Sequence, residues 1–264
     1  MTKPIVLYTG PSMLDGLPIV VLATLDSSNV KTGRIVQTWI MRADSPPHTA
    51  GAVGDDLSVC GMCPRRHFLG GDCYVIKHQG PLSTWKNWER AGKPDADLPS
   101  AIDRIREATS EYGLRLGSYG DPAAVPSDSV WIPIIKATTP RICVGYTHQH
   151  KALNFVSSTN TYKHVQWCRE NLMASCDTPE EAVLASAGGW RYFLAVPVGV
   201  APPPKAIMCL ADRENSTKTC STCGICDGSQ KKATRASVFL NEHGAKSISK
   251  GKRLAALRVI QPNA

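Results

Sequence analysis

Three cysteines stand at two-residue intervals near the end of the chain, at Cys220, Cys223 and Cys226, and Cys209 precedes Cys220 by ten intervening residues. A C-x-x-C-x-x-C run places three thiolates in one loop, which suits three corners of a four-iron cubane and leaves the fourth corner to a remote cysteine. Zinc is more often held by two separate Cys-x-x-Cys hairpins. The spacing therefore predicts an iron–sulfur site, with a single structural zinc ion on the same four thiolates as the alternative.

A second cysteine group lies far upstream, where Cys60, Cys63 and Cys73 occupy a glycine-rich stretch. Three thiolates on a four-iron cluster would leave one iron open to a substrate or cofactor, and an open coordination position is the condition for chemistry at a metal. His67 stands between Cys63 and Cys73, however, and its imidazole would complete a tetrahedral zinc site. Both interpretations stay open, so the sequence predicts one or two 4Fe-4S clusters, with zinc as the alternative.

Metal is favoured over disulfides because the chain looks intracellular. Its beginning lacks the basic stretch and apolar run of a secretory leader, and no apolar run reaches membrane-spanning length. In a reducing compartment, clustered thiols bind metal more readily than they form disulfides. The remaining cysteines, Cys143, Cys168 and Cys176, lie among apolar neighbours and are predicted to be core thiols.

The net charge of the chain indicates which kinds of partner it could bind. Of the 264 residues, Lys and Arg number 30 and Asp and Glu 22, a formal net charge of +8, and part of the excess falls between Lys231 and Arg258. Such a surface favours nucleic acid or another polyanion, or a host factor, as a partner. The alternative is a solvated basic face, because aromatic residues make up only 6% of the chain and no RNA-reading motif is present.

The elements that must position these groups alternate along the chain. Apolar spacing predicts helices over 81–91, 100–112, 125–138 and 162–170, and strands over 34–42, 114–117, 141–146, 171–176, 192–196, 206–209 and 237–240. Thr178, Pro179 and Glu181 form a helix start signal for a further helix that ends at Gly188. Single helices between strands imply parallel crossovers. We therefore expect an α/β protein with a partial or complete β/α-barrel-like core of mainly parallel strands and a cysteine-rich C-terminal extension.

The expected organisation is an N-terminal arm over 1–30, the barrel-like core with the first cysteine loop over 31–200, and the cysteine-cluster extension with a basic tail over 201–264. Ligand groups in such folds gather at the carboxyl ends of the strands. The first cysteine loop, the turn from Gly117 to Asp121, His148 and Asp177 all follow predicted strands. We expect them on one face, with both clusters facing the carboxyl ends.

Several motifs together carry a resemblance. Lys31-Thr-Gly-Arg-Ile-Val-Gln-Thr-Trp39, Cys60-Gly-Met-Cys63-Pro-Arg, the segment Arg115–Pro126 and Gly145-Tyr-Thr-His148, with the terminal cysteine group, resemble uncharacterised phage and prophage proteins over most of residues 31–245. More distantly, the chain is similar to phage proteins related to radical S-adenosylmethionine (SAM) enzymes. Those enzymes hold a four-iron cluster by three cysteines on a partial β/α barrel, usually with C-x3-C-x2-C spacing, whereas Cys73 here lies nine intervening residues beyond Cys63.

The resemblance implies a function and a cofactor site. It makes the protein an iron–sulfur phage protein of the host cytoplasm with radical-SAM-like or redox chemistry at an open cluster, and it makes the second cysteine group an auxiliary cluster. Gly117, Ser118, Asp121 and His148 would then face the SAM cofactor. The bland alternative is that Asp121 caps a helix with Pro122 at its first position and that His148 is a solvated loop residue. The alternative function is a zinc-stabilised protein that binds nucleic acid or a host factor, without a membrane partner.

Overall fold

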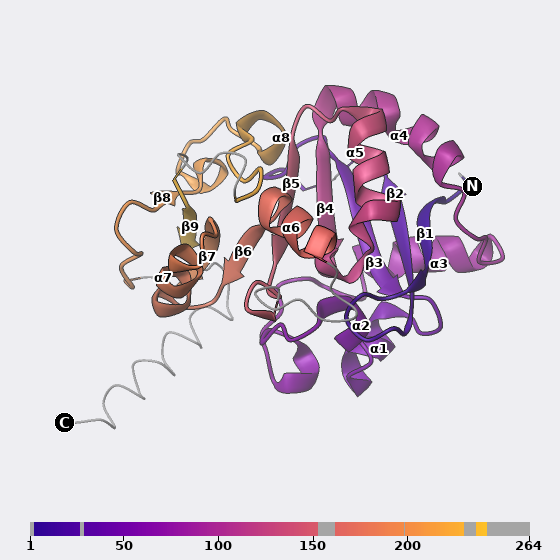
Figure 1. Ribbon diagram of the computed structural model, residues 1–264, viewed down its shortest axis with the longest axis horizontal. Coiled ribbons are helices and arrows are strands. Elements are labelled where there is room, and N and C mark those ends of the chain that lie inside the picture. The colour runs from indigo at the N-terminus through magenta and orange to yellow at the C-terminus, as the bar shows by residue number, and fades with distance from the viewer. Residues whose placement is uncertain (1–2, 27–28, 153–161, 198, 230–235, 242–264) are drawn as a thin grey trace.

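The computed structural model describes residues 3–26, 29–152, 162–197, 199–229 and 236–241. These residues form an α/β fold around one nine-stranded sheet with the strand order β1-β2-β3-β4-β5-β6-β7-β9-β8 (Figure 1). The first two pairings are antiparallel and all the others are parallel. The described strands do not close on themselves, because β1 and β8 lie at opposite edges of the sheet. A complete barrel is therefore not formed by the described residues.

The strands are β1 (Ile5–Pro11), β2 (Pro18–Thr24), β3 (Val36–Arg42), β4 (Leu114–Tyr119), β5 (Cys143–Thr147), β6 (Met173–Cys176), β7 (Tyr192–Val196), β8 (Ile207–Met208) and β9 (Val238–Asn241). The α-helices are α1 (Pro47–Val53), α2 (Leu57–Cys60), α3 (Gly80–Arg90), α4 (Leu98–Tyr112), α5 (Ile132–Thr138), α6 (Tyr162–Asn171), α7 (Pro179–Ala187) and α8 (Cys220–Cys223). Short turns η1 (His67–Leu69), η2 (Pro122–Ala124), η3 (Ser127–Trp131) and η5 (Leu210–Asp212) complete the described elements.

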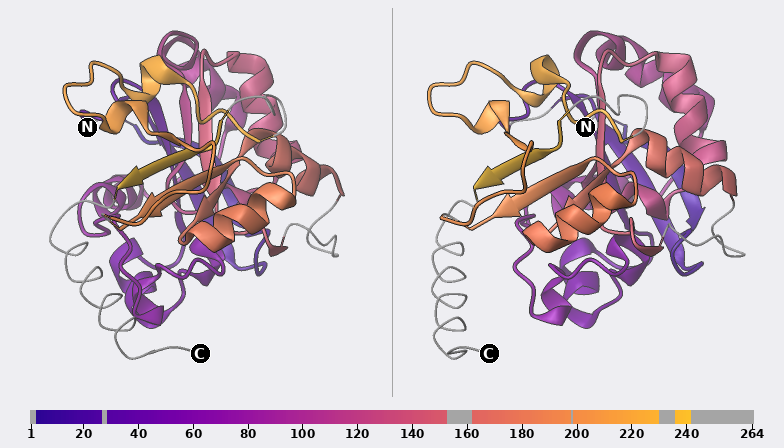
Figure 2. Two further views of the ribbon diagram at one scale, coloured as in Figure 1. Left: turned by 90° about the vertical axis from the view of Figure 1, so that its left-hand side faces the viewer. Right: turned by 60° about the vertical axis from the view of Figure 1, so that its left-hand side comes forward.

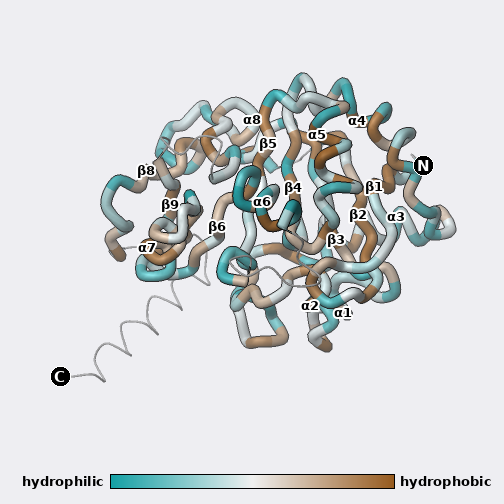
Figure 3. The backbone as a smooth tube through the Cα atoms, viewed as in Figure 1, coloured by the Kyte–Doolittle hydropathy of each residue, from teal (hydrophilic) through white to brown (hydrophobic). Residues whose placement is uncertain are grey.

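Helices α4 to α7 lie on one side of the sheet, which we call the outer face. The opposite side, the inner face, carries α3 and the cysteine-rich segment near the carboxyl end of the chain (Figure 2, left). The strands run as hydrophobic segments through the middle of the molecule (Figure 3). Their apolar side chains, such as Leu116, Ile40 and Leu194, are fully buried in one large core with Trp131 and Ile105 of the outer layer. Burial of these apolar side chains holds the helices against the sheet.

The segment predicted as an N-terminal arm contributes two strands to the sheet. Hairpin β1–β2 pairs antiparallel with β3, and residues 19–22 of β2 are almost completely inaccessible. The extension likewise returns to the sheet, because β9 pairs with β7 and β8 pairs with β9. Most of the basic sequence from Lys231 onward lies outside the described residues. Among the described helices, none is long and apolar enough to cross a bilayer.

The two cysteine groups do not both face the carboxyl ends of the strands. Helix α2, which ends at Cys60, follows the carboxyl end of β3. Helix α8 lies at the other end of the same strand, where the Cys220 amide donates to the Lys31 carbonyl at 3.1 Å and the Ser221 amide to Thr32 at 3.0 Å. The expectation of one shared end was wrong, because the loop before β3 supplies the backbone acceptors that fix α8.

Candidate functional site

The first cysteine loop is held in place by a buried ionic group. Asp56, directly before α2, is completely inaccessible and accepts hydrogen bonds from Arg66 Nε at 2.8 Å and Lys77 Nζ at 2.9 Å. Arg66 also donates to the carbonyls of Gly54 and Gly61. Because Arg66 follows Cys63 and Lys77 follows Cys73 in the sequence, their shared carboxylate holds both parts of the loop against α2.

The three thiols of this loop lie close enough to influence one another. Burial raises the pKa of the Cys60 thiol well above its ordinary value, and Asp56, Cys63 and Cys73 raise it further. Burial also raises the pKa of Cys73, with Cys63 acting in the same direction. Tyr119 of β4 belongs to this cluster, since burial and then the charges of Cys60, Asp56 and Cys73 raise its pKa. Its buried hydroxyl has no hydrogen-bond partner among the described residues. The sequence prediction had brought together the thiols but not this phenol.

An amide clamp joins the loop to the end of β5. Gln149 Nε2 donates to the Cys60 carbonyl at 3.0 Å, and its Oε1 accepts from the Met62 amide at 3.2 Å. Gly61 between them has φ of 55°, and a Cβ atom there would lie 2.4 Å from Gln149 Oε1. Only glycine fits this turn, because it combines the left-handed region of backbone space with direct contact to another side chain.

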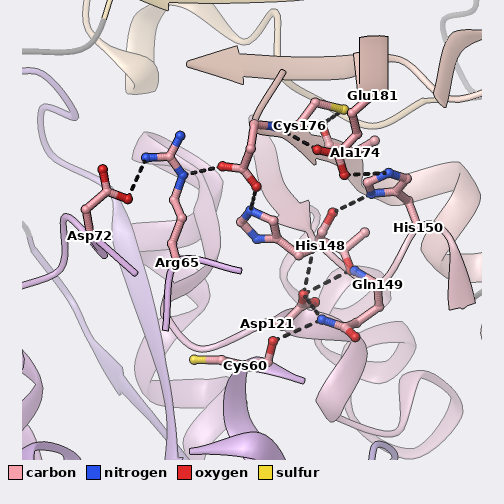
Figure 4. A network of polar contacts seen from close by, with 12 residues as sticks. Cys60, Arg65, Asp72, Asp121, His148, Gln149, His150, Ala174, Cys176 and Glu181 are labelled. Carbon is pink, nitrogen blue, oxygen red and sulfur yellow. Dashed lines mark hydrogen bonds and ion pairs between the residues drawn. The ribbon is translucent and has the colours of Figure 1, made fainter. Parts of the chain in front are cut away.

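Asp121 stands at the centre of the polar network drawn in Figure 4. Its carboxylate accepts from the amides of Ala123 and His148, from the Thr147 hydroxyl and from Gln149 Nε2, at 2.9–3.2 Å. Burial raises its pKa despite these donors. The Asp121–Pro122 cap of η2 is present as the sequence predicted. These contacts tie the end of β5 to the turn after β4.

Gly117 and Ser118, the other residues of the predicted cofactor turn, have different surroundings. The Gly117 amide donates to Thr38 Oγ1 at 2.9 Å, so it is engaged within the sheet. Ser118 is buried, and its hydroxyl finds no hydrogen-bond partner within the described residues. Of the four predicted cofactor residues, His148 is the one whose side chain reaches the first cysteine group.

His148 connects the first cysteine group to β6. Its Nε2 is 3.3 Å from Oδ2 of Asp177, the residue after β6, and the Cys63 thiol lies near enough to raise its pKa. Burial opposes protonation of His148, but Asp177 and Cys63 outweigh it and raise its pKa to about 10. Burial likewise disfavours the charged form of Asp177, yet His148 and Arg65 bring its pKa down to about 2. Asp177 also pairs with Arg65, which lies in the same loop as Cys63, so Asp177 joins His148 to the first cysteine loop (Figure 4).

The sequence offered a different histidine, His67, as one possible ligand beside the thiols. His67 lies in η1 with its side chain exposed, and no contact with a thiol is seen for it within the described residues. His150 points to α7, where its Nε2 is 3.5 Å from Glu181 Oε1. The strand-end position of His148, next to Thr147 in the motif Tyr-Thr-His, was the signal that could have paired it with Cys63.

The second cysteine group gathers below the inner face of the sheet. Burial raises the pKa of Cys226 to about 12; Tyr146 opposes this rise, whereas Cys220, Cys209 and Cys223 add to it. Burial also raises the pKa of Cys209, with Cys223 contributing, and that of Cys220, with Cys209 and Cys223 contributing. All four predicted thiols therefore lie within electrostatic reach of one another. Cys168 and Cys176 are buried in the main core, and Cys143 packs at its margin.

A buried arginine shapes the loop that carries Cys226. Arg191 donates to the carbonyls of Ile225, Gly228 and Ala236 at 2.5–3.0 Å and lies 3.3 Å from Asp227. The Ser229 hydroxyl donates to the Leu172 carbonyl at 2.6 Å. These bonds dock the second cysteine loop on the strands β6 and β7. No three His, Cys, Asp or Glu side chains in the described part of the chain are already arranged as a metal cage.

No family model, curated protein or solved structure matches this chain. The class that the fold and the site define is an open, mainly parallel α/β sheet with two separate groups of unpaired thiols.

Proposed function

We propose that the protein is an iron–sulfur protein in which Cys60, Cys63 and Cys73 hold a four-iron cluster and Cys209, Cys220, Cys223 and Cys226 hold a second. The observation that carries the proposal is that three thiols from a loop of fourteen residues lie close together, because Cys63 and Cys73 raise the pKa of Cys60 and Cys63 raises that of Cys73. Buried thiols lacking a counterion stay protonated, and a bound metal is what would stabilise them as thiolates. The donor set is therefore suited to a metal.

The arrangement around the first group supports chemistry rather than a purely structural role. Three thiols leave one coordination position of a four-iron cluster for another ligand. Tyr119, with a hydroxyl that has no partner among the described residues, lies beside them on the inner face. The strand order from β3 to β9, with helices on the outer face, supports the finer proposal of a partial β/α barrel around this site. A cluster with one exposed iron supplies electron transfer or Lewis-acid chemistry to whatever binds there.

The more specific form of the proposal is a phage or prophage protein of the host cytoplasm with radical-SAM-like chemistry. It is supported by the motif resemblance and by the position of His148 next to Cys63. Binding of SAM to the anaerobically reconstituted protein, measured by equilibrium dialysis, tests this form. A reconstituted cluster that neither binds nor cleaves SAM would remove it and would leave the cluster itself in place.

Metal analysis of protein purified without oxygen tests the main proposal. We expect about four iron and four sulfide per chain for each cluster present. Replacing Cys60, Cys63 and Cys73 together by Ser should remove one set, and replacing Cys220, Cys223 and Cys226 the other. The matched control is Cys143→Ser, which alters a thiol outside both groups and should keep the full metal content. Colourless protein with stoichiometric zinc and negligible iron would contradict the proposal.

One observation favours zinc at the first group as a second candidate, in a protein that binds nucleic acid or a host factor through its basic surface. The imidazole of His148 lies near Cys63 and is 3.3 Å from the Asp177 carboxylate, an arrangement typical of a metal-ligating histidine with its carboxylate partner. With His148 as fourth ligand, the site would be Cys3His and closed. His148→Ala should then abolish zinc binding at this group, whereas His67→Ala, at the exposed position, should not. Salt-sensitive binding of DNA or RNA tests the accompanying function.

A further inference from the structure

Exposed apolar side chains are concentrated around the first cysteine group. Thirteen large apolar residues of the described chain are exposed, and seven of them fall between residues 53 and 76. These seven are Val53, Leu57, Met62, Phe68, Leu69, Tyr74 and Ile76. Single exposed apolar residues are normal on a protein surface, whereas a contiguous group marks a surface that binds something.

Phe68 brings several members of this group together. Its ring lies 3.0 Å from the position that a Cβ atom of Gly54 would occupy, so the ring rests directly on the backbone there. Gly54 lies between Val53, the last residue of α1, and Leu57, the first residue of α2. We call Val53, Leu57, Phe68 and its chain neighbour Leu69 the apolar patch.

The backbone beneath the apolar patch is fixed by buried hydrogen bonds. Arg66, two residues before Phe68, donates from Nη2 to the Gly54 carbonyl at 2.6 Å. The same guanidinium donates from Nε to Asp56 at 2.8 Å. Because one arginine holds both the end of α1 and the start of the turn that carries Phe68, the apolar side chains are presented at the surface in a defined arrangement.

A sequence with complementary properties stands in residues 242–264, which lie outside the described residues. Leu254, Leu257 and Ile260 recur at three-residue intervals, which is typical of an apolar stripe on a helix. Asp55, which is exposed beside Gly54, adds a carboxylate to the rim of the apolar patch. The segment 242–264 supplies cations that complement this charge, namely Lys246, Lys250, Lys252, Arg253 and Arg258.

The topology allows this segment to reach the apolar patch. Strands β3 to β7 and β9 are parallel, so the chain leaves β9 at Asn241 on the same edge of the sheet at which the first cysteine loop leaves β3. Five strand spacings separate β3 from β9, which is about 24 Å. The ten residues 242–251 span up to about 33–36 Å when extended, which is enough to bring residue 252 across this distance.

We propose that residues 252–260 dock on the apolar patch of the same chain, with Leu254, Leu257 and Ile260 against Phe68 and its apolar neighbours and with the cations toward Asp55. The docked segment lies against the loop that carries the first cysteine group and restricts access to it. This inference goes beyond the proposed metal site and does not depend on which metal the thiols bind.

Photo-crosslinking in the full chain tests the proposal. The photoreactive residue p-benzoylphenylalanine replaces Leu257, and cross-linked peptides are identified by mass spectrometry after irradiation. We expect cross-links to peptides from residues 53–69, in a product of monomer mass on a denaturing gel. Phe68→Ser should lower the yield at least about threefold, because it removes the largest apolar side chain of the patch. Leu184→Ser, at a similarly exposed residue of α7, is the matched control and should leave the yield unchanged.

A second variant keeps the test independent of any folding defect in Phe68→Ser. Leu254→Ser combined with Ile260→Ser leaves the described fold untouched and should lower the yield to the same extent. Cross-links confined to other parts of the chain, or a yield that neither variant changes, would overturn the proposal. A cross-linked product of dimer mass would also overturn it, and would assign the apolar patch to a second copy of the chain.

Discussion

Among single residues, Gly61 occupies a position where no side chain fits. Its Cβ would lie 2.4 Å from Gln149 Oε1, and its φ of 55° is left-handed. We expect Gly61→Ala to displace Gln149, release the Cys60 carbonyl and lower the metal content of the first group. Gly70→Ala is the control in the same loop, because Gly70 has φ of 75° but no atom near the Cβ position.

Comparing Gly61→Ala with Gly70→Ala separates the effect of the Gln149 contact from that of backbone strain. Gly70→Ala should destabilise the protein by about 1 kcal/mol through the backbone alone. Gly61→Ala should cost clearly more in urea unfolding. Equal losses of stability and of metal in the two variants would show that Gln149 does not clamp the loop.

The buried carboxylate of Asp56 gives a second prediction at this scale. Asp56→Asn leaves Arg66 and Lys77 buried without their shared counterion, which we expect to cost about 3–5 kcal/mol. Asp103→Asn breaks an exposed pair with Arg106 and should cost less than about 1 kcal/mol. Chemical denaturation of both variants measures the difference, and similar values for the two would contradict the assigned role of Asp56.

At the scale of elements, α7 shows how far the sequence reaches. Thr178, Pro179 and Glu181 predicted a capped helix that ends at Gly188, and α7 has these bounds, with the Thr178 hydroxyl accepting from the Glu181 amide at 3.1 Å. The Glu181 carboxylate does not complete a capping box. It accepts from the Asp177 amide instead and pairs with Lys151 at 3.0 Å.

This cap can be tested directly. Thr178→Ala removes the acceptor for the first turn of α7 and should lower the free energy of unfolding by about 0.5–2 kcal/mol. The exposed Val183 in the same helix provides the control, since Val183→Ala should change stability by less than about 0.5 kcal/mol. Thermal unfolding of the pair measures the effect, and an unchanged Thr178→Ala variant would refute it.

Local patterns predicted most helices and strands because burial periodicity and caps act over a few residues. The helices predicted over 81–91 and 162–170 correspond to α3 and α6, and the strand over 192–196 to β7. Sequence did not predict that β1 and β2 join the sheet, since pairing is decided by distant partners. For the same reason it grouped the thiols but missed the proximity of His148 to Cys63 and the triad of Asp56, Arg66 and Lys77. That the thiols bind a metal, and which metal it is, stay predictions.

For the whole molecule, His164 links stability to pH. Its imidazole joins α6 to the turns after β4, with Nδ1 3.1 Å from Ser127 Oγ and Nε2 3.1 Å from the Ala123 carbonyl. Burial lowers its pKa below the ordinary 6.5, although the Ala123 carbonyl, Asp128 and Asp121 act in the opposite direction. Below pH 6.5 the unfolded chain therefore binds a proton that the folded protein does not.

Stability should consequently fall as the pH is lowered from 6.5 through the folded pKa of His164. His164→Gln should flatten this part of the profile of unfolding free energy against pH, and the exposed His78→Gln should leave it as in wild type. Urea unfolding between pH 5 and 8 gives both curves. A profile of the same slope in all three proteins would exclude His164 as its origin.

The hydrogen bonds from α8 to Lys31 and Thr32 have a consequence for biosynthesis. The segment before β3 that carries Lys31 and Thr32 leaves the ribosome early. Helix α8, which contains Cys220, emerges only after most of the polypeptide has been made. At translation speeds of about 5–20 residues per second, this interval lasts on the order of 10–40 s. For most of it, the upstream thiols are already outside the exit tunnel, so the order of translation alone exposes the first cysteine group to solution before the second.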